Sequence, residues 1–176
     1  MGINMINERL MIFIDGSNVY KEADRFKKNY QVNYEKLVEM LAVGRQLIRP
    51  YFYSSTLIES PKDDTNFFDM LQCRGFKTII KPIREIGEKR TEKGVDVALA
   101  TDLLSLAYNN AYDTAILVTG DGDLCDVVGR VQALGKRVEV AFFKRSLAWS
   151  LLKECDRTTY LDDIWEKIEF KEKGGK

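Results

Sequence analysis

Two short apolar runs of this chain each end in aspartate. Residues 10–14 lead into Asp15, and residues 115–119 lead into the sequence Gly-Asp-Gly-Asp at positions 120–123. Short runs rich in β-branched and aromatic residues, bounded by glycine, are typical of buried parallel strands. In open α/β sheets, ligands bind just beyond the carboxyl ends of such strands. We therefore expect carboxylates from both runs to meet at one edge of a sheet.

Carboxylates gathered in a cleft need a neutralising partner. Two of them ~4 Å apart repel by about 4 kcal/mol at an effective dielectric constant of about 20. Shared protons or a divalent cation would relieve this repulsion. The chain contains no histidine, which removes the usual nitrogen ligand of zinc, the usual general base and every Ser-His or Cys-His nucleophile. We therefore favour oxygen-ligand chemistry with Mg²⁺ or Mn²⁺.

The candidate catalytic residues, which are also the candidate metal ligands, are Asp15, Asp96, Asp121 and Asp123. Each has an alternative structural role. Asp15 could simply form a turn with the following glycine. Asp96 could cap a helix, or its charge could interact favourably with the positive end of the helix dipole. One of Asp121 and Asp123 could cap the next helix, but both cannot cap the same amide. The glycines of this segment allow a tight backbone path that could bring its carboxylates together.

Three further polar residues could support the site. Ser17 and Asn18 follow Asp15 closely, and the Asn18 amide could orient a carboxylate or a water, or cap a helix. Asp102 lies six residues after Asp96. On a helix this spacing makes it a poor partner for the same ion, so it would support the site indirectly or make a surface contact. Asp126 could be a further acid of the site or a surface residue.

The elements that must position these residues follow from hydrophobic patterning. The pattern predicts strands at residues 10–14, 51–56, 77–82, 115–119, 137–143 and 158–161. It predicts helices at residues 19–28, 34–43, 61–75, 95–108, 124–134, 147–154 and 163–170. Residues 84–94 are polar and charged, which indicates a loop or a small hairpin. Strands alternating with helices predict an α/β fold with a parallel sheet covered on both faces.

Length and charge limit the organisation of the chain. The 176 residues fit one domain, at residues 9–170, with tails at residues 1–8 and 171–176. The 27 basic and 27 acidic residues cancel, so no global field draws the protein to nucleic acid. A local basic stretch could contact RNA phosphates, or could be a solvated loop of mixed charge. Its RNA-binding candidates are Lys81, Arg84, Lys89, Arg90 and Lys93.

Location and assembly can also be predicted. The three cysteines match no metal-binding spacing, and the chain has neither an N-terminal apolar signal segment nor a long apolar run. We therefore expect a cytoplasmic protein without membrane association. Zero net charge and an exposed edge strand favour self-association.

Three motifs, taken in order, resemble a known family. Residues 13–18 (FIDGSN), 93–102 (KGVDVALATD) and 118–124 (VTGDGDL) are similar to the NYN domain of the PIN-like nuclease superfamily, in particular its LabA-like branch. The resemblance covers roughly residues 10–143. One departure is the sequence Leu124-Cys125-Asp126, where the family pattern has an aromatic residue and then a proline.

This resemblance implies a three-layer α/β/α sandwich with a central, mainly parallel sheet. It also implies an acidic site that binds one or two Mg²⁺ or Mn²⁺ ions and hydrolyses RNA phosphodiester bonds. The implied ligands are Asp15, Asp96, Asp121 and Asp123, with Ser17, Asn18 and Asp102 beside them.

We therefore expect a metal-dependent ribonuclease that acts on single-stranded RNA, with Tyr20, Tyr51 or Tyr53 available to stack on a base. The first alternative is a catalytically weak or inactive RNA- or protein-binding regulatory module of the same fold. The second is a phosphatase with an aspartate nucleophile. Such enzymes usually place a second acid within two residues of the first, where this chain has Gly16 and Ser17.

Overall fold

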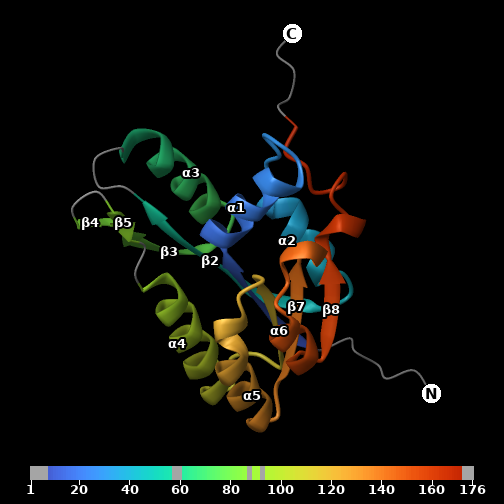
Figure 1. Cartoon of the computed structure of the whole chain (residues 1–176). Coiled ribbons are helices and arrows are strands. Elements are labelled where there is room, and N and C mark those ends of the chain that lie inside the picture. The colour runs from blue at the N-terminus through green and yellow to red at the C-terminus, as the bar shows by residue number, and fades with distance from the viewer. Residues whose placement is uncertain (1–7, 57–60, 87–88, 92–93, 172–176) are drawn as a thin grey trace.

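The core of the protein is a six-stranded, entirely parallel sheet (Figure 1). The computed structural model describes residues 8–56, 61–86, 89–91 and 94–171, so all but one residue of each predicted tail lies outside it. The strand order is β3-β2-β1-β6-β7-β8. The strands are β1 (Arg9–Asp15), β2 (Gln46–Thr56), β3 (Lys77–Pro82), β6 (Thr114–Val118), β7 (Arg137–Phe142) and β8 (Arg157–Tyr160).

Helices cover both faces of the sheet. One face carries α1 (Gly16–Phe26), α2 (Tyr34–Ala42) and α3 (Pro61–Cys73). The other carries α4 (Val95–Tyr108), α5 (Cys125–Ala133) and α6 (Trp149–Glu154) (Figure 1). Burial on both faces explains why β1 and β6 are apolar along almost their whole length. The expected three-layer α/β/α sandwich is therefore confirmed.

The strand order reverses between β1 and β6, and we call the region beyond the carboxyl ends of these two strands the crevice. From β1 the chain builds β2 and β3 on one side, and it then crosses over to build β6, β7 and β8 on the other. Such a reversal leaves the loops after the two central strands diverging, and ligands of open α/β sheets bind there. Ile14 pairs in register with Val118, so the aspartates that follow both strands start from the same level of the sheet.

The polar segment after β3 folds as a small hairpin, one of the two forms that the sequence predicts. Its strands are β4 (Arg84–Ile86) and β5 (Lys89–Thr91), which pair antiparallel. The hairpin extends from the carboxyl end of β3 and leads toward the first turn of α4 (Figure 1). It is therefore attached to the same edge of the sheet as the crevice.

The predicted helix at residues 163–170 is wrong. The chain instead forms the 3-10 turn η3 (Leu161–Asp163), followed by further turns. The backbone N–H of Asn33 donates to the carbonyl of Ile168 (N···O 2.7 Å), and that of Phe170 donates to the carbonyl of Gln31 (N···O 2.8 Å). These bonds to the segment before α2 replace the bonds that a helix would make within itself.

Among the described helices, none combines the length and apolar composition needed to cross a lipid bilayer.

Candidate active site

Asp15 ends β1 and is buried, with only 4% of its surface exposed. The backbone N–H of Asn18 donates to its Oδ1 (N···O 3.0 Å), so Asp15 caps α1. Asp15 also pairs in register with Tyr53 of β2, which places both side chains on the face of the sheet covered by α4. A single carboxylate therefore begins a helix and faces the crevice.

The pKa of Asp15 is raised to about 6. Burial is the main cause, and the carboxylates of Asp96 and Asp121 add to it by electrostatic repulsion. The hydrogen bond from the Asn18 backbone and the positive charge of Lys21 act in the opposite direction. The charges of Asp96 and Asp121 therefore both act on Asp15 in the folded protein.

Asp96 and Asp121 reach the crevice from opposite sides. Asp96 is in the first turn of α4, where Gly94 occupies the capping position without a side-chain bond, so Asp96 is not the N-cap. Its side chain is exposed, although apolar residues flank it on both sides in the sequence. Asp121 caps the 3-10 turn η1 (Gly122–Leu124) and accepts the backbone N–H of Asp123 (N···O 3.0 Å).

Thr119 connects the two sides of the crevice, a role that sequence reasoning missed. This threonine is fully buried, and its Oγ1 accepts the backbone N–H of Asp121 (N···O 3.2 Å). The same hydroxyl lies 3.5 Å from Oδ2 of Asp15, to which it can donate. The feature of the sequence that could have indicated this role is a hydroxyl residue between a buried apolar run and the acidic turn.

Asn18 makes a second connection across the crevice. Its side-chain Oδ1 accepts the backbone N–H of Gly120 (N···O 3.2 Å). Because Asp15 already caps α1, the Asn18 amide is available for this bond between the start of α1 and the loop after β6. This bond places the Asn18 side chain beside the loop that carries Asp121.

The glycines of the acidic turn are required by close packing. A Cβ on Gly120 would lie 2.3 Å from the backbone oxygen of Ser146 and 2.5 Å from the Phe142 ring. The backbone N–H of Ala148 also donates to the carbonyl of Gly120 (N···O 3.0 Å). Neither Gly120 nor Gly122 is among the described residues with positive φ. The turn therefore needs glycine because neighbouring atoms leave no room for a side chain, and not because of an unusual backbone conformation.

The remaining candidate acids lie less centrally. Asp123 is exposed, and Asp126 is exposed in the first turn of α5. Asp102 accepts a hydrogen bond from the hydroxyl of Tyr53 (O···O 2.8 Å), which links α4 to β2. Asp102 therefore has a partner on the sheet, whereas Asp96 lies in the first turn of the same helix. The Ser17 hydroxyl lies 3.4 Å from that of Ser55, at the start of α1.

The aromatic candidates differ in their access to a ligand. Tyr53 is fully buried with its hydroxyl bonded to Asp102, so it cannot stack on a base. Tyr51 is half-buried and stacks on Tyr53, with ring centroids 6.2 Å apart. Tyr20, by contrast, is 68% exposed.

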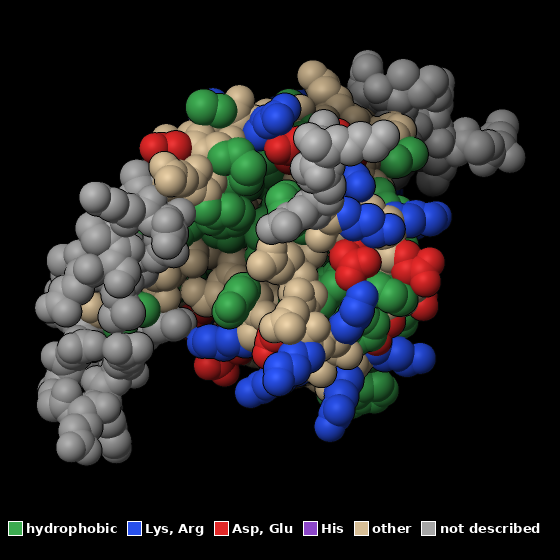
Figure 2. All heavy atoms as spheres, turned by 90° about the horizontal axis from the view of Figure 1, so that it is seen from above, with side chains coloured by type: hydrophobic (Ala, Val, Ile, Leu, Met, Phe, Trp, Pro, Cys, Tyr) green, Lys and Arg blue, Asp and Glu red, His purple; other side chains and the backbone are tan. Residues whose placement is uncertain are grey.

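The basic candidates border the same edge of the sheet. Lys81 is half-buried near the end of β3, where it pairs in register with Ser55. The backbones of Arg84, Lys89 and Arg90 form the hairpin, whereas their side chains and the whole of Lys93 lie outside the described structure. Positive and negative side chains are interspersed on the face seen from above (Figure 2).

The candidate ligands suit a hard divalent cation, although they are not close enough together to surround one. All candidate ligands are carboxylates, and burial together with the charges of Asp96 and Asp121 raises the pKa of Asp15. Within the described part of the chain, no three acidic or thiol side chains are close enough to form a ready-made metal site. The chemistry of the residues therefore fits a divalent ion, and binding would require the carboxylates to move closer together.

A six-stranded parallel sheet covered by helices on both faces is consistent with a PIN-like α/β sandwich. Residues 9–162 match the NYN domain model, and the chain therefore belongs to the NYN domain family. No protein of curated function matches the sequence significantly.

Two solved structures are similar to different degrees. A crystal structure of a protein of unknown function from Vibrio parahaemolyticus matches with a TM-score of 0.77 and 22% identity, covering 97% of this chain and 99% of that one. It supports the fold alone. A UDP-glucosyltransferase from Polygonum tinctorium matches with a TM-score of 0.38 and 10% identity, covering 78% of this chain and 29% of that one. That resemblance is too weak to support an argument.

Proposed function

We propose that this protein is a metal-dependent ribonuclease that hydrolyses RNA phosphodiester bonds at the crevice between β1 and β6. The observation that carries the proposal is the raised pKa of buried Asp15, caused in part by the nearby charges of Asp96 and Asp121. A buried group perturbed by specific neighbours in a crevice is a marker of a functional site. Membership of the NYN domain family supports a nuclease of the PIN-like class.

Four carboxylates would hold the ion or ions: Asp15, Asp96, Asp121 and Asp123. Bound Mg²⁺ or Mn²⁺ would supply positive charge and Lewis acidity toward water and the phosphate oxygens. The chain itself supplies orientation. Thr119 and Asn18 hold the carboxyl ends of β1 and β6 together, so that Asp15 and Asp121 keep their relative positions.

The substrate side of the proposal concerns RNA. Lys81 lies near the carboxyl end of β3 and the hairpin follows it, so these basic residues would contact phosphates on either side of the cleaved bond. A single strand fits better than a duplex, because its bases are free to contact side chains. The cytoplasmic location, self-association and the LabA-like assignment rest on the sequence alone.

RNA cleavage in the presence of Mn²⁺ tests this function. We expect the wild-type protein to cleave single-stranded RNA, and Asp15→Asn or Asp121→Asn to lower the rate at least about 100-fold, because each removes a carboxylate of the site. The control is Asp163→Asn, an exposed acid on η3 beyond the edge strand β8, which should cleave normally. Undiminished cleavage by either site variant would contradict the assignment.

A second candidate is a regulatory module that binds RNA without efficient chemistry. The observation in its favour is that the described acids do not already form a closed metal site. Measurable RNA affinity, combined with no cleavage of RNA or DNA across several divalent metals, would support this candidate over the nuclease.

A further inference from the structure

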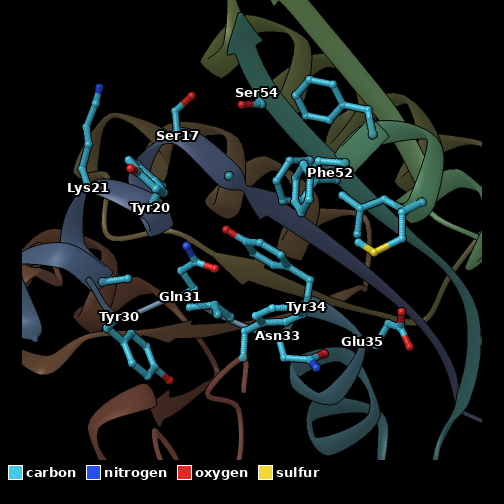
Figure 3. A pocket seen from close by; sticks show the side chains of 18 of the residues that line it. Ser17, Tyr20, Lys21, Tyr30, Gln31, Asn33, Tyr34, Glu35, Phe52 and Ser54 are labelled. Carbon is cyan, nitrogen blue, oxygen red and sulfur yellow. The ribbon is translucent and has the colours of Figure 1, made fainter. Parts of the chain in front are cut away.

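A large cavity lies on the opposite face of the sheet from α4, beside the acidic crevice. It has a volume of about 690 Å³ and is enclosed by α1, α2, α3 and β2 (Figure 3). Pockets for small organic ligands typically measure about 300–1,000 Å³. Gly16 and Ser17, the two residues after Asp15, form part of its wall. The cavity therefore begins one residue away from the proposed catalytic carboxylate.

The walls of the cavity are largely aromatic. Tyr34 and Phe52 meet edge to face with centroids 4.8 Å apart, and Phe52 meets Phe67 in the same way at 5.7 Å. Phe68 and the exposed Tyr20 extend this lining toward the solvent. Rings arranged at steep angles leave faces and edges available to a further flat ring.

Polar groups interrupt this lining. Figure 3 shows the Tyr34 hydroxyl pointing into the cavity, with Ser17 and Ser54 on the side nearest the crevice. Within the described part of the chain, the Tyr34 hydroxyl has no hydrogen-bond partner, and burial raises its pKa, so it stays a donor at neutral pH. A purely apolar ligand would leave the Tyr34 hydroxyl buried without a partner, which is costly. A flat ring with a polar edge satisfies both kinds of lining.

The wall of the cavity includes the backbone that directly follows Asp15. A Cβ on Gly16 would lie 2.2 Å from the Phe52 ring, so this ring rests against the backbone that follows Asp15. Phosphate and base of one nucleotide are only a few bonds apart. A strand whose phosphate lies at the crevice can therefore place an adjacent base over Phe52.

We propose that this aromatic cavity binds one nucleobase of the RNA strand next to the cleaved phosphate, an inference that rests on the proposed nuclease function. The base packs between Phe52 and Tyr20, and its polar edge bonds the Tyr34 hydroxyl and the serines. Stacking on aromatic side chains tolerates all bases, whereas hydrogen bonds at the edge discriminate between them. The cavity thus provides both affinity for single-stranded RNA and a base preference.

Binding of nucleosides without any divalent ion tests the cavity separately from catalysis. Ligand-observed NMR titrations in EDTA compare adenosine, guanosine, cytidine and uridine with ribose. At least one nucleoside should bind at least about tenfold more tightly than ribose, because stacking of a base supplies that much affinity. Equal affinities for ribose and all four nucleosides would overturn the inference.

Matched tyrosine variants locate the binding. Tyr20→Ala should weaken nucleoside binding about threefold to tenfold, and Tyr34→Phe should reduce the difference between bases. Tyr108→Ala is the control, since Tyr108 is 79% exposed at the end of α4, outside the cavity. Tyr20→Ala and Tyr108→Ala with the same affinity as the wild type would overturn the inference. Thermal unfolding of each variant verifies that it is folded.

The two experiments distinguish a wrong proposal about the cavity from a wrong proposal about the nuclease function. If Tyr20→Ala weakens nucleoside binding and the wild-type protein does not cleave RNA with Mn²⁺, the result supports the cavity and contradicts the nuclease. RNA cleavage without nucleoside binding contradicts the proposal about the cavity and supports the nuclease function.

Discussion

At the scale of single residues, Asp15 shows that a structural and a chemical role can coexist. Its Oδ1 accepts the backbone N–H of Asn18 in the first turn of α1, and its Oδ2 faces Thr119 at the crevice. Asp121 likewise caps a turn while its charge acts on Asp15. A carboxylate has two oxygens, so one can cap a helix while the other faces a ligand, and the two roles do not exclude each other.

The raised pKa of Asp15 makes protein stability depend on pH. The pKa is about 6 in the folded protein against a reference value of 3.8. Between these values the folded protein keeps a proton that the unfolded chain has lost, so the free energy of unfolding decreases as pH rises through this interval. Above about pH 6 the ionised carboxylate destabilises the metal-free fold by about 2 to 3 kcal/mol.

Asp15→Asn removes this cost and retains an oxygen that can cap α1. In EDTA at pH 7.5, the variant should therefore exceed the wild type in free energy of unfolding by about 2 kcal/mol. At pH 4 the two proteins should be nearly equal. Urea denaturation at both pH values measures the difference, and an advantage for the variant that is the same at both would contradict the raised pKa.

At the scale of elements, the acidic turn depends on the loop that follows β7. The backbone around Ser146 occupies the space where a side chain of Gly120 would lie. Backbone atoms cannot move aside as the end of a flexible side chain can. The position of Asp121 is thus set by packing between two loops at the carboxyl edge of the sheet.

Gly120→Ala should therefore destabilise the protein by about 1 to 3 kcal/mol, the usual cost of adding a group to a packed site. Gly129→Ala is a matched control inside α5, where a Cβ would meet only the carboxylate end of Glu154. That substitution should be neutral or stabilise by up to about 1 kcal/mol, because alanine favours helix. Thermal unfolding of both variants measures this contrast, and equal stability would contradict the packing argument.

Several elements could be predicted from sequence for a clear physical reason. The strand at residues 10–14 is marked by a continuous apolar run, and glycine with positive φ ends α3 and α5 at Gly75 and Gly135, as predicted. The predicted helix at residues 163–170 fails because its periodicity reports only which side chains are buried. The competing backbone bonds come from Gln31 and Asn33, far away in the chain.

At the scale of the whole molecule, topology gathers acids that are distant in sequence. Strand order brings β1 beside β6, and the crossover through α4 brings Asp96 to the same edge. The sequence allowed the shared edge of β1 and β6 to be predicted, since parallel strands share a carboxyl edge. It could not reveal the roles of Thr119 and Tyr34, because these depend on contacts between elements.

The topology also places two different surfaces at one edge of the sheet. The acids lie on the α4 side of β1, and the aromatic cavity lies on the side of α1, α2 and α3. Gly16 is the point where they meet, one residue after Asp15. A single strand of RNA that crosses this edge would contact both.

The most direct test of the account is a calorimetric titration of Mn²⁺ into the wild type, the three variants Asp15→Asn, Asp96→Asn and Asp121→Asn, and the control Asp163→Asn. If one pocket holds the ion, each of the three substitutions should weaken binding at least about tenfold, or about 1.4 kcal/mol. The control should bind like the wild type. Wild-type affinity for Mn²⁺ in all three site variants would contradict the existence of a shared metal site.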